Sequence, residues 1–208
     1  METAVTRSRL LRTGGLGAAA LLLGGTALGP GARAAAAAPP QGGFGPLAAG
    51  DLAYTRLLIA IELLTIDFYT NALAARHWRG ATARDARLAL VNENEHYTYL
   101  ANAISIVGLT PLSAGDVSFT YEAGTFYSAA SLFGMVFTLE SLALGACLGS
   151  AGKIANPVLA GAIAQITACE AQHLSAFSVR GREPAFTNAF PQPLSIAEAS
   201  DALDAYTS

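Results

Sequence analysis

Two copies of the spacing Glu-x-x-His are the strongest indication of the fold in this sequence. They are Glu93–His96 and Glu170–His173, and each lies in its own long helical segment. On an α-helix, residues three positions apart share one face, so each pair points a carboxylate and an imidazole in the same direction. Two such pairs on separate helices favour a metal site, whereas a single pair is also typical of a hydrogen-bonded Glu–His contact on one helix.

Two further apolar segments each carry a glutamate near the middle, Glu62 and Glu140. A buried carboxylate without a partner costs several kcal/mol or becomes neutral. Four carboxylates together carry a charge of about −4, which two divalent cations balance. The pattern therefore predicts a site for two metal ions, iron or alternatively manganese, inside a four-helix bundle. The expected ligands are Glu62, Glu93, His96, Glu140, Glu170 and His173.

Hydrophobic periodicity and helix-capping signals predict an all-α fold with four long helices. We expect Asp51 to cap the first helix, Thr82 and Asp85 to form a capping box at the second, and Asn156–Pro157 to open the fourth. The expected helices span about 51–77, 82–107, 126–150 and 157–179. Short links between the first two and the last two helices, with a long link over 108–125, predict two antiparallel hairpins joined by a crossover.

The ends of the chain differ in composition from the predicted bundle, which covers 51–180. Residues 1–34 have a basic start, an apolar stretch and a small-residue cleavage site, which predict an export signal of the Sec or twin-arginine-like type. An uncleaved membrane anchor is the alternative interpretation. Residues 35–50 read as a flexible linker. Residues 181–208 read as an extended tail with a short helix that opens at a capping box, Ser195–Glu198.

Composition excludes several other classes of protein. The chain is 52% hydrophobic and only 13% charged, with a net charge of −3, so it has no basic footprint for nucleic acid. Its two cysteines, Cys147 and Cys169, fall at different levels of the predicted bundle, and we expect two free thiols. The apolar segment 126–150 is long enough to span a bilayer. The charges on the first two helices nevertheless favour a bundle with no membrane span in the mature protein.

Four stretches resemble the ferritin-like superfamily, in particular exported bacterial ferritin-like domain proteins. They are AIELLTIDFY, NENEHYTYL, LESLALGACLG and CEAQHLSAF, in the family's order within about residues 51–180. The resemblance implies a diiron or related site with the six ligands named above. It further implies that Glu93 and Glu170 bridge the ions and that Glu62 and Glu140 are terminal ligands. Many diiron proteins have an aspartate before a motif glutamate, whereas this chain has Asn92 and Cys169.

The functional expectations follow from such a site. As an enzyme, the protein would be a ferroxidase-like diiron oxidoreductase that uses O₂ or peroxide, or a manganese enzyme that dismutes peroxide. The alternatives are a metal-storage protein and a metal-free structural or stress-related interaction module of the cell envelope. We expect a periplasmic or extracellular location, and an oligomer is compatible with the sequence. Tyr69 lies seven residues after Glu62 on the same helix face, so we expect it to bond a neighbour in the core or a ligand.

Overall fold

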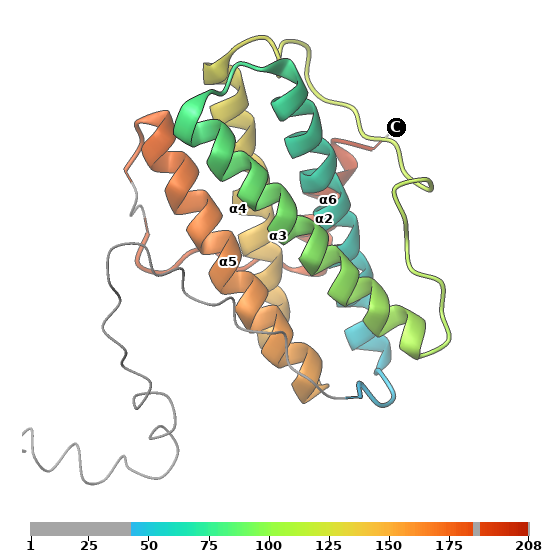
Figure 1. Cartoon of the computed structure of the whole chain (residues 1–208). Coiled ribbons are helices and arrows are strands. Elements are labelled where there is room, and N and C mark those ends of the chain that lie inside the picture. The colour runs from blue at the N-terminus through green and yellow to red at the C-terminus, as the bar shows by residue number, and fades with distance from the viewer. Residues whose placement is uncertain (1–42, 185–187, 208) are drawn as a thin grey trace, which may run out of the picture. The chain divides into compact units, whose positions relative to one another are not determined.

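The computed structural model describes residues 43–184 and 188–207, and their regular structure is helical. The helices are α2 (Ala49–Ala75), α3 (Gly80–Ile106), α4 (Ala129–Ala151), α5 (Pro157–Gly181) and α6 (Ile196–Asp204), as Figure 1 shows. The described residues contain no strand, and the expected all-α fold is confirmed. The predicted export signal and the first half of the predicted linker, residues 35–42, lie outside the described residues.

The four long helices form a ring. The helix pairs α2–α3 and α4–α5 make the most extensive contacts, and α2–α4 and α3–α5 close the ring. Each of the first two pairs is a hairpin with a short link, whereas residues 107–128 form the long crossover beside α2 (Figure 1). The Tyr121 hydroxyl donates to Asp67 of α2 at 2.8 Å and fixes the crossover there. The expected bundle of two hairpins joined by a crossover is confirmed.

The first helix starts earlier than its capping signal predicts, and Asp51 is not its N-cap. α2 begins at Ala49, with Ala48 at the N-cap position and no side-chain cap. Asp51 is buried, and its carboxylate accepts the backbone N–H groups of Ala155 at 2.7 Å and Asn156 at 3.1 Å. This carboxylate therefore ties the first turn of α2 to the α4–α5 link, a contact that local sequence does not reveal.

The predicted capping box at Thr82 and Asp85 is also wrong. α3 begins at Gly80, whose φ of +56° lies in the left-handed region that glycine adopts most readily. This turn starts the helix two residues before the predicted box. Asp85 is thus inside the helix, where its carboxylate accepts a hydrogen bond from Nε of Arg180 on α5 at 2.8 Å.

The remaining helix starts follow their side-chain caps. The Asn156 side chain accepts N–H groups at the start of α5, and Ser195 and Glu198 cap α6 reciprocally, both as predicted. α4 begins at Ala129 instead of 126, because Ser128 and Ser131 form a capping box there. These caps satisfy N–H groups that have no partner within the helix.

The C-terminal tail crosses α4 at two glycines and then continues into α6, which packs on α2 and α4. The Leu194 N–H donates to the carbonyl of Gly145 at 2.8 Å. A Cβ atom placed on Gly149 would lie 1.7 Å from the carbonyl oxygen of Leu194. The tail can therefore approach α4 this closely only because glycine occupies position 149.

Two helices, α2 and α4, are long and apolar enough to cross a membrane by length and composition. The most apolar windows of these helices are 61% and 56% buried inside the bundle. Each helix also places one glutamate in the bundle interior, Glu62 in α2 and Glu140 in α4. Core helices of bundles have the same length and hydropathy, so these windows are weak evidence for a membrane span.

Candidate metal centre

Six polar side chains converge in the apolar interior of the helix ring. α2 and α4 each contribute one glutamate, whereas α3 and α5 each contribute a Glu-x-x-His pair. The three glutamates Glu93, Glu140 and Glu170 have no exposed surface, and the His96 side chain is the most exposed of the six at 12%. The structure thus brings together all six residues that the sequence singles out: Glu62, Glu93, His96, Glu140, Glu170 and His173.

These residues form two overlapping groups, each able to hold a metal ion. One group consists of Glu62, Glu93, His96 and Glu170, and the other of Glu93, Glu140, Glu170 and His173. Within each group the potential ligand atoms lie within 4.8 Å of one another. Glu93 and Glu170 belong to both groups. The arrangement therefore offers two adjacent ion positions with two shared carboxylates.

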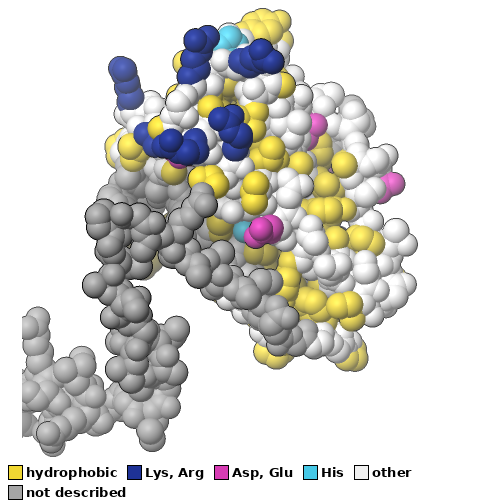
Figure 2. Space-filling view, in the orientation of Figure 1, with side chains coloured by type: hydrophobic (Ala, Val, Ile, Leu, Met, Phe, Trp, Pro, Cys, Tyr) yellow, Lys and Arg dark blue, Asp and Glu magenta, His cyan; other side chains and the backbone are white. Residues whose placement is uncertain are grey.

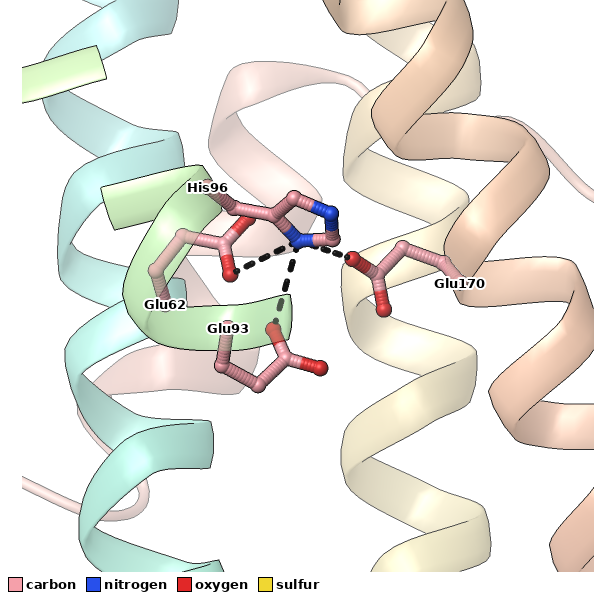
Figure 3. Close-up of side chains that lie close together, drawn as sticks. All are labelled: Glu62, Glu93, His96 and Glu170. Atoms are coloured by element: carbon pink, nitrogen blue, oxygen red, sulfur yellow. Dashed lines mark ion pairs between the residues drawn. The ribbon is translucent and has the colours of Figure 1, made fainter. Parts of the chain in front are cut away.

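The first group is built around the His96 ring (Figure 3). Its Nδ1 atom lies 3.0 Å from Glu170 Oε1, and 3.6 Å from both Glu62 Oε2 and Glu93 Oε2. These carboxylates come from three different helices, α2, α3 and α5. One imidazole nitrogen carries at most one proton, so a hydrogen bond can satisfy only one of the three contacts.

The second group repeats this pattern around His173. Its Nδ1 atom lies 2.9 Å from Glu93 Oε1, 3.4 Å from Glu170 Oε2 and 3.6 Å from Glu140 Oε2. Each histidine thus has its shortest contact with the Glu-x-x-His glutamate of the other helix. The two ring centroids are 6.4 Å apart, so the two groups are distinct but adjacent.

Several buried polar atoms of the cluster have no hydrogen-bond partner within the described part of the chain, and a bound metal ion would explain their presence in the core. Seven of its buried oxygen and nitrogen atoms have no hydrogen-bond partner in the described residues, because the close N···O contacts do not align a proton with an oxygen. Spacings near 3 Å are those of neighbouring ligands on an ion with bonds of about 2.1 Å. Carboxylate and imidazole are also ligands that iron, manganese and zinc accept. The donor set therefore fits metal.

Comparison with known families agrees with this geometry. A family model for the ferritin-like domain matches residues 50–180, which is more than half of the chain. The chain belongs to the ferritin-like domain family. The resemblance of the sequence to the ferritin-like superfamily is thereby confirmed. A search of curated proteins finds no match to this chain.

Charge in the metal-free ferritin-like centre is balanced by protons. Burial opposes the charge on His96, but contacts with Cys169, Glu170 and Glu62 raise its pKa well above the ordinary value. Burial likewise opposes charge on His173, whereas Glu140 and Cys169 raise its pKa. Both histidines therefore carry a proton at neutral pH when no metal is bound.

The pKa values of the cluster glutamates shift in two directions. Burial raises the pKa of Glu140 to about 8, and burial together with the charge of Glu93 raises the pKa of Glu62. Burial also acts on Glu93, but contacts with His173 and His96 lower its pKa below the ordinary value. Glu62 and Glu140 are therefore mostly protonated at neutral pH, and metal binding must displace those protons.

Hydroxyl groups surround the carboxylates of this ferritin-like centre. Tyr69 donates a short hydrogen bond to Glu140, which agrees with the expectation for this tyrosine. Thr65 lies 3.4 Å from Glu93 through its Oγ1 atom and also donates to the Glu62 carbonyl at 2.9 Å. Thr65 is not among the six residues that the sequence pattern singles out, although its place three residues after Glu62 puts it on the same helix face.

The outer nitrogen of His173 faces Asn92 and Cys169, the residues that directly precede the glutamates of the two Glu-x-x-His pairs. The amide Nδ2 of Asn92 lies 3.0 Å from His173 Nε2, and Cys169 Sγ lies 3.5 Å from the same atom. Cys147 is buried, and both thiols are free, as predicted. An amide and a thiol therefore contact the Nε2 atom of His173, where a carboxylate is the usual partner of a ligand histidine, and these contacts orient the ring.

Proposed function

We propose that this ferritin-like protein binds two iron ions in the bundle core, with manganese as the alternative. The observation that carries the proposal is the pair of histidine-centred groups that share Glu93 and Glu170. In this proposal Glu93 and Glu170 would be shared between the two ions, Glu62 and Glu140 would each hold one ion, and each histidine would hold one ion through a ring nitrogen. The buried oxygen and nitrogen atoms of the cluster that lack a hydrogen-bond partner in the described residues support the proposal, because they would become ligands when metal binds.

The proposed reaction is the oxidation of Fe(II) by O₂ or peroxide. Bound iron would supply the electrons, and this chain's residues would control charge and access around it. The burial of the six ligands limits water at the site, and the carboxylates hold positive charge in an apolar interior. Tyr69 orients Glu140 by its hydrogen bond. Dismutation of peroxide is the corresponding reaction for a manganese-loaded centre.

Oxygen uptake tests this reaction directly. Fe(II) is added anaerobically to the metal-free protein. The loaded protein is then mixed with oxygenated buffer, and the oxygen concentration is followed with an electrode. We expect uptake well above that of Fe(II) in buffer, and its loss in Glu93→Gln. Glu95→Gln is the matched control, because Glu95 is exposed on the same helix two residues away. Three results together would contradict an oxidoreductase: oxygen uptake by the iron-loaded protein equal to that of Fe(II) in buffer, no faster oxidation of Fe(II) by peroxide, and no loss of peroxide with the manganese-loaded protein.

Metal storage is the second candidate function, and it rests on the same two ion positions. A storage protein would bind two ions tightly without turnover. The metal-free interaction module of the cell envelope would bind neither iron nor manganese. Metal retention measured beside oxygen uptake therefore separates these three proposals from one another.

We also propose that the protein is exported, with its first 34 residues as the cleaved signal. The basic start and the small residues Ala32 and Ala34 support this proposal. The intact mass of the protein from the exported fraction tests it. A mature chain that begins near residue 35 is expected, whereas a full-length chain in the cytoplasm would contradict export.

A further inference from the structure

Six exposed arginines gather at one end of the bundle. They lie in the α2–α3 turn, the first two turns of α3 and the end of α5. Figure 2 shows Lys and Arg side chains grouped at the upper end of the molecule, over these elements. We call this surface the basic end, and its residues are Arg76, Arg79, Arg84, Arg87, Arg180 and Arg182.

The charge at this end is opposite to that of the rest of the bundle. The segments 76–88 and 179–184 contain six arginines and only two acids, Asp85 and Glu183. Elsewhere the described residues contain two basic side chains, Arg56 and Lys153, and twelve acidic ones. Four of these acids are the buried glutamates of the metal centre, which leaves eight acidic side chains against the two basic ones. Such a separation of charge gives the molecule a positive pole that attracts polyanions.

Exposed aliphatic side chains adjoin the basic end. Leu88 and Val91 on α3 are 48% and 53% exposed, and Val179 on α5 is 55% exposed. Arg84, Leu88 and Val91 follow one another at helical spacing on a single outward face. The ion pair between Arg180 and Asp85, at 2.7 Å, joins α5 to α3 at this level. We call Leu88, Val91 and Val179 the aliphatic strip.

We propose that the basic end and the aliphatic strip dock on a bilayer surface that contains anionic phospholipids. Guanidinium groups bind lipid phosphates, and neighbouring aliphatic side chains enter the interface between headgroups and acyl chains. The exposed apolar residues beside Arg84 and Arg87 on α3 are the aliphatic Leu88 and Val91, whereas binding of single-stranded nucleic acid uses aromatic stacking. Glu95, one helical turn beyond Val91, is exposed and marks the edge of the docking surface.

Co-sedimentation with vesicles tests the proposal on the full chain. The probe is a phosphatidylcholine vesicle with about 30% phosphatidylglycerol at low salt. We expect Arg84→Gln with Arg87→Gln to lower the partition coefficient by about tenfold or more, and salt to reduce this difference. Arg56→Gln with Lys153→Gln removes the same charge outside the basic end and should leave binding unchanged. Leu88→Ser with Val91→Ser should weaken binding at every salt concentration.

Chemical footprinting places the contact on individual residues. Phenylglyoxal modifies exposed arginines, and mass spectrometry reads the rate at each one. Anionic vesicles should slow modification of Arg84 and Arg87 but leave Arg56 unchanged, which separates docking by this surface from attachment through another part of the chain. Equal protection of Arg56 would overturn the proposal. Three results of the binding experiments would overturn it too. The two charge variants could bind anionic vesicles equally well, or the protein could bind pure phosphatidylcholine vesicles as well as anionic ones. In the third, the substitutions at Arg84 and Arg87 would weaken binding to an oligonucleotide but not to vesicles.

Discussion

Tyr69 on α2 donates a hydrogen bond to Glu140 on α4, across the interface between two helices that belong to different hairpins. The tyrosine ring is held in place by Phe68 and Phe177, whose ring centroids each lie 5.6 Å away. One hairpin therefore holds a carboxylate of the other in position at the metal centre. This contact couples the packing of the bundle to the geometry of the site.

Replacing Tyr69 by phenylalanine distinguishes the contribution of its hydroxyl group from that of its ring. Tyr69→Phe keeps the aromatic contacts but leaves Glu140 without this donor, so we expect the metal-free protein to lose about 1–3 kcal/mol of unfolding free energy. Metal affinity should fall by about tenfold, as is usual when a group that orients a ligand is removed. Denaturant titration and metal competition measure the two effects. Tyr127→Phe at an exposed position is the control, and identical behaviour of both variants would contradict this role of Tyr69.

The stability of the metal-free protein should fall as pH rises from about 5 to 9. The folded-state pKa values of His96, His173, Glu62 and Glu140 all lie above their ordinary values, so the folded chain holds more protons than the unfolded chain. Stability from these groups is complete below their ordinary pKa values and is lost as pH passes through the raised ones. The lowered pKa of Glu93 does not offset this loss, because its contribution is already complete above about pH 5.

Denaturation in the presence of a chelator, repeated with saturating metal, measures this dependence. Metal replaces the protons, so the loaded protein should be far less sensitive to pH over the same range. Glu140→Gln should remove the part of the slope that lies between its ordinary pKa of 4.5 and about 8. A metal-free protein that becomes more stable as pH rises would contradict the charge balance described here.

Metal loading at pH 7 should release protons. The two protonated histidines, together with Glu62 and Glu140, must become ligands without their protons, so about four protons per chain are expected when both positions fill. Calorimetry in two buffers of different ionisation enthalpy counts them. Affinity should weaken as pH falls, because more protons compete for the ligands. Binding without proton release would show that the ions sit elsewhere.

The closeness of the tail to α4 predicts opposite effects for two glycines of that helix. A Cβ on Gly134 would meet nothing within 4 Å, so Gly134→Ala should stabilise the protein by up to about 1 kcal/mol through helix propensity. A Cβ on Gly149 would overlap Leu194, so Gly149→Ala should lower the melting temperature and make residues 188–195 easier to cleave. Equal effects of the two variants on stability and proteolysis would contradict this packing.

The sequence predicts the centre well because the spacing of residues along a helix determines which side chains share one face. Glu93 and His96 face inward together because they lie three residues apart, and the hairpin topology brings the equivalent pair on α5 to the same level. Carboxylates in an otherwise apolar segment, such as Glu140, indicate the bundle interior for the same reason. Fold class, crossover and the convergence of the six residues follow from local patterns of this kind.

Other features depend on tertiary contacts that no local pattern contains. Asp51 has the residue type and position of an N-cap, but its carboxylate binds N–H groups more than 100 residues away in sequence. Asp85 likewise finds Arg180 instead of the first turn of its own helix. The basic end forms where the fold brings together helix ends that are distant in sequence. In the sequence its six arginines are therefore not recognisable as one cluster.

The proposed metal centre requires that the bundle core bind two metal ions through its six carboxylate and imidazole side chains. Elemental mass spectrometry of mature protein, purified without chelators and again after loading with Fe(II) or Mn(II), tests it most directly. We predict about two ions per chain, retained in Glu95→Gln and lost in Glu93→Gln with Glu170→Gln, because both ions share those two carboxylates. One ion per chain, no ion at all, or two ions retained in the double variant would contradict the account.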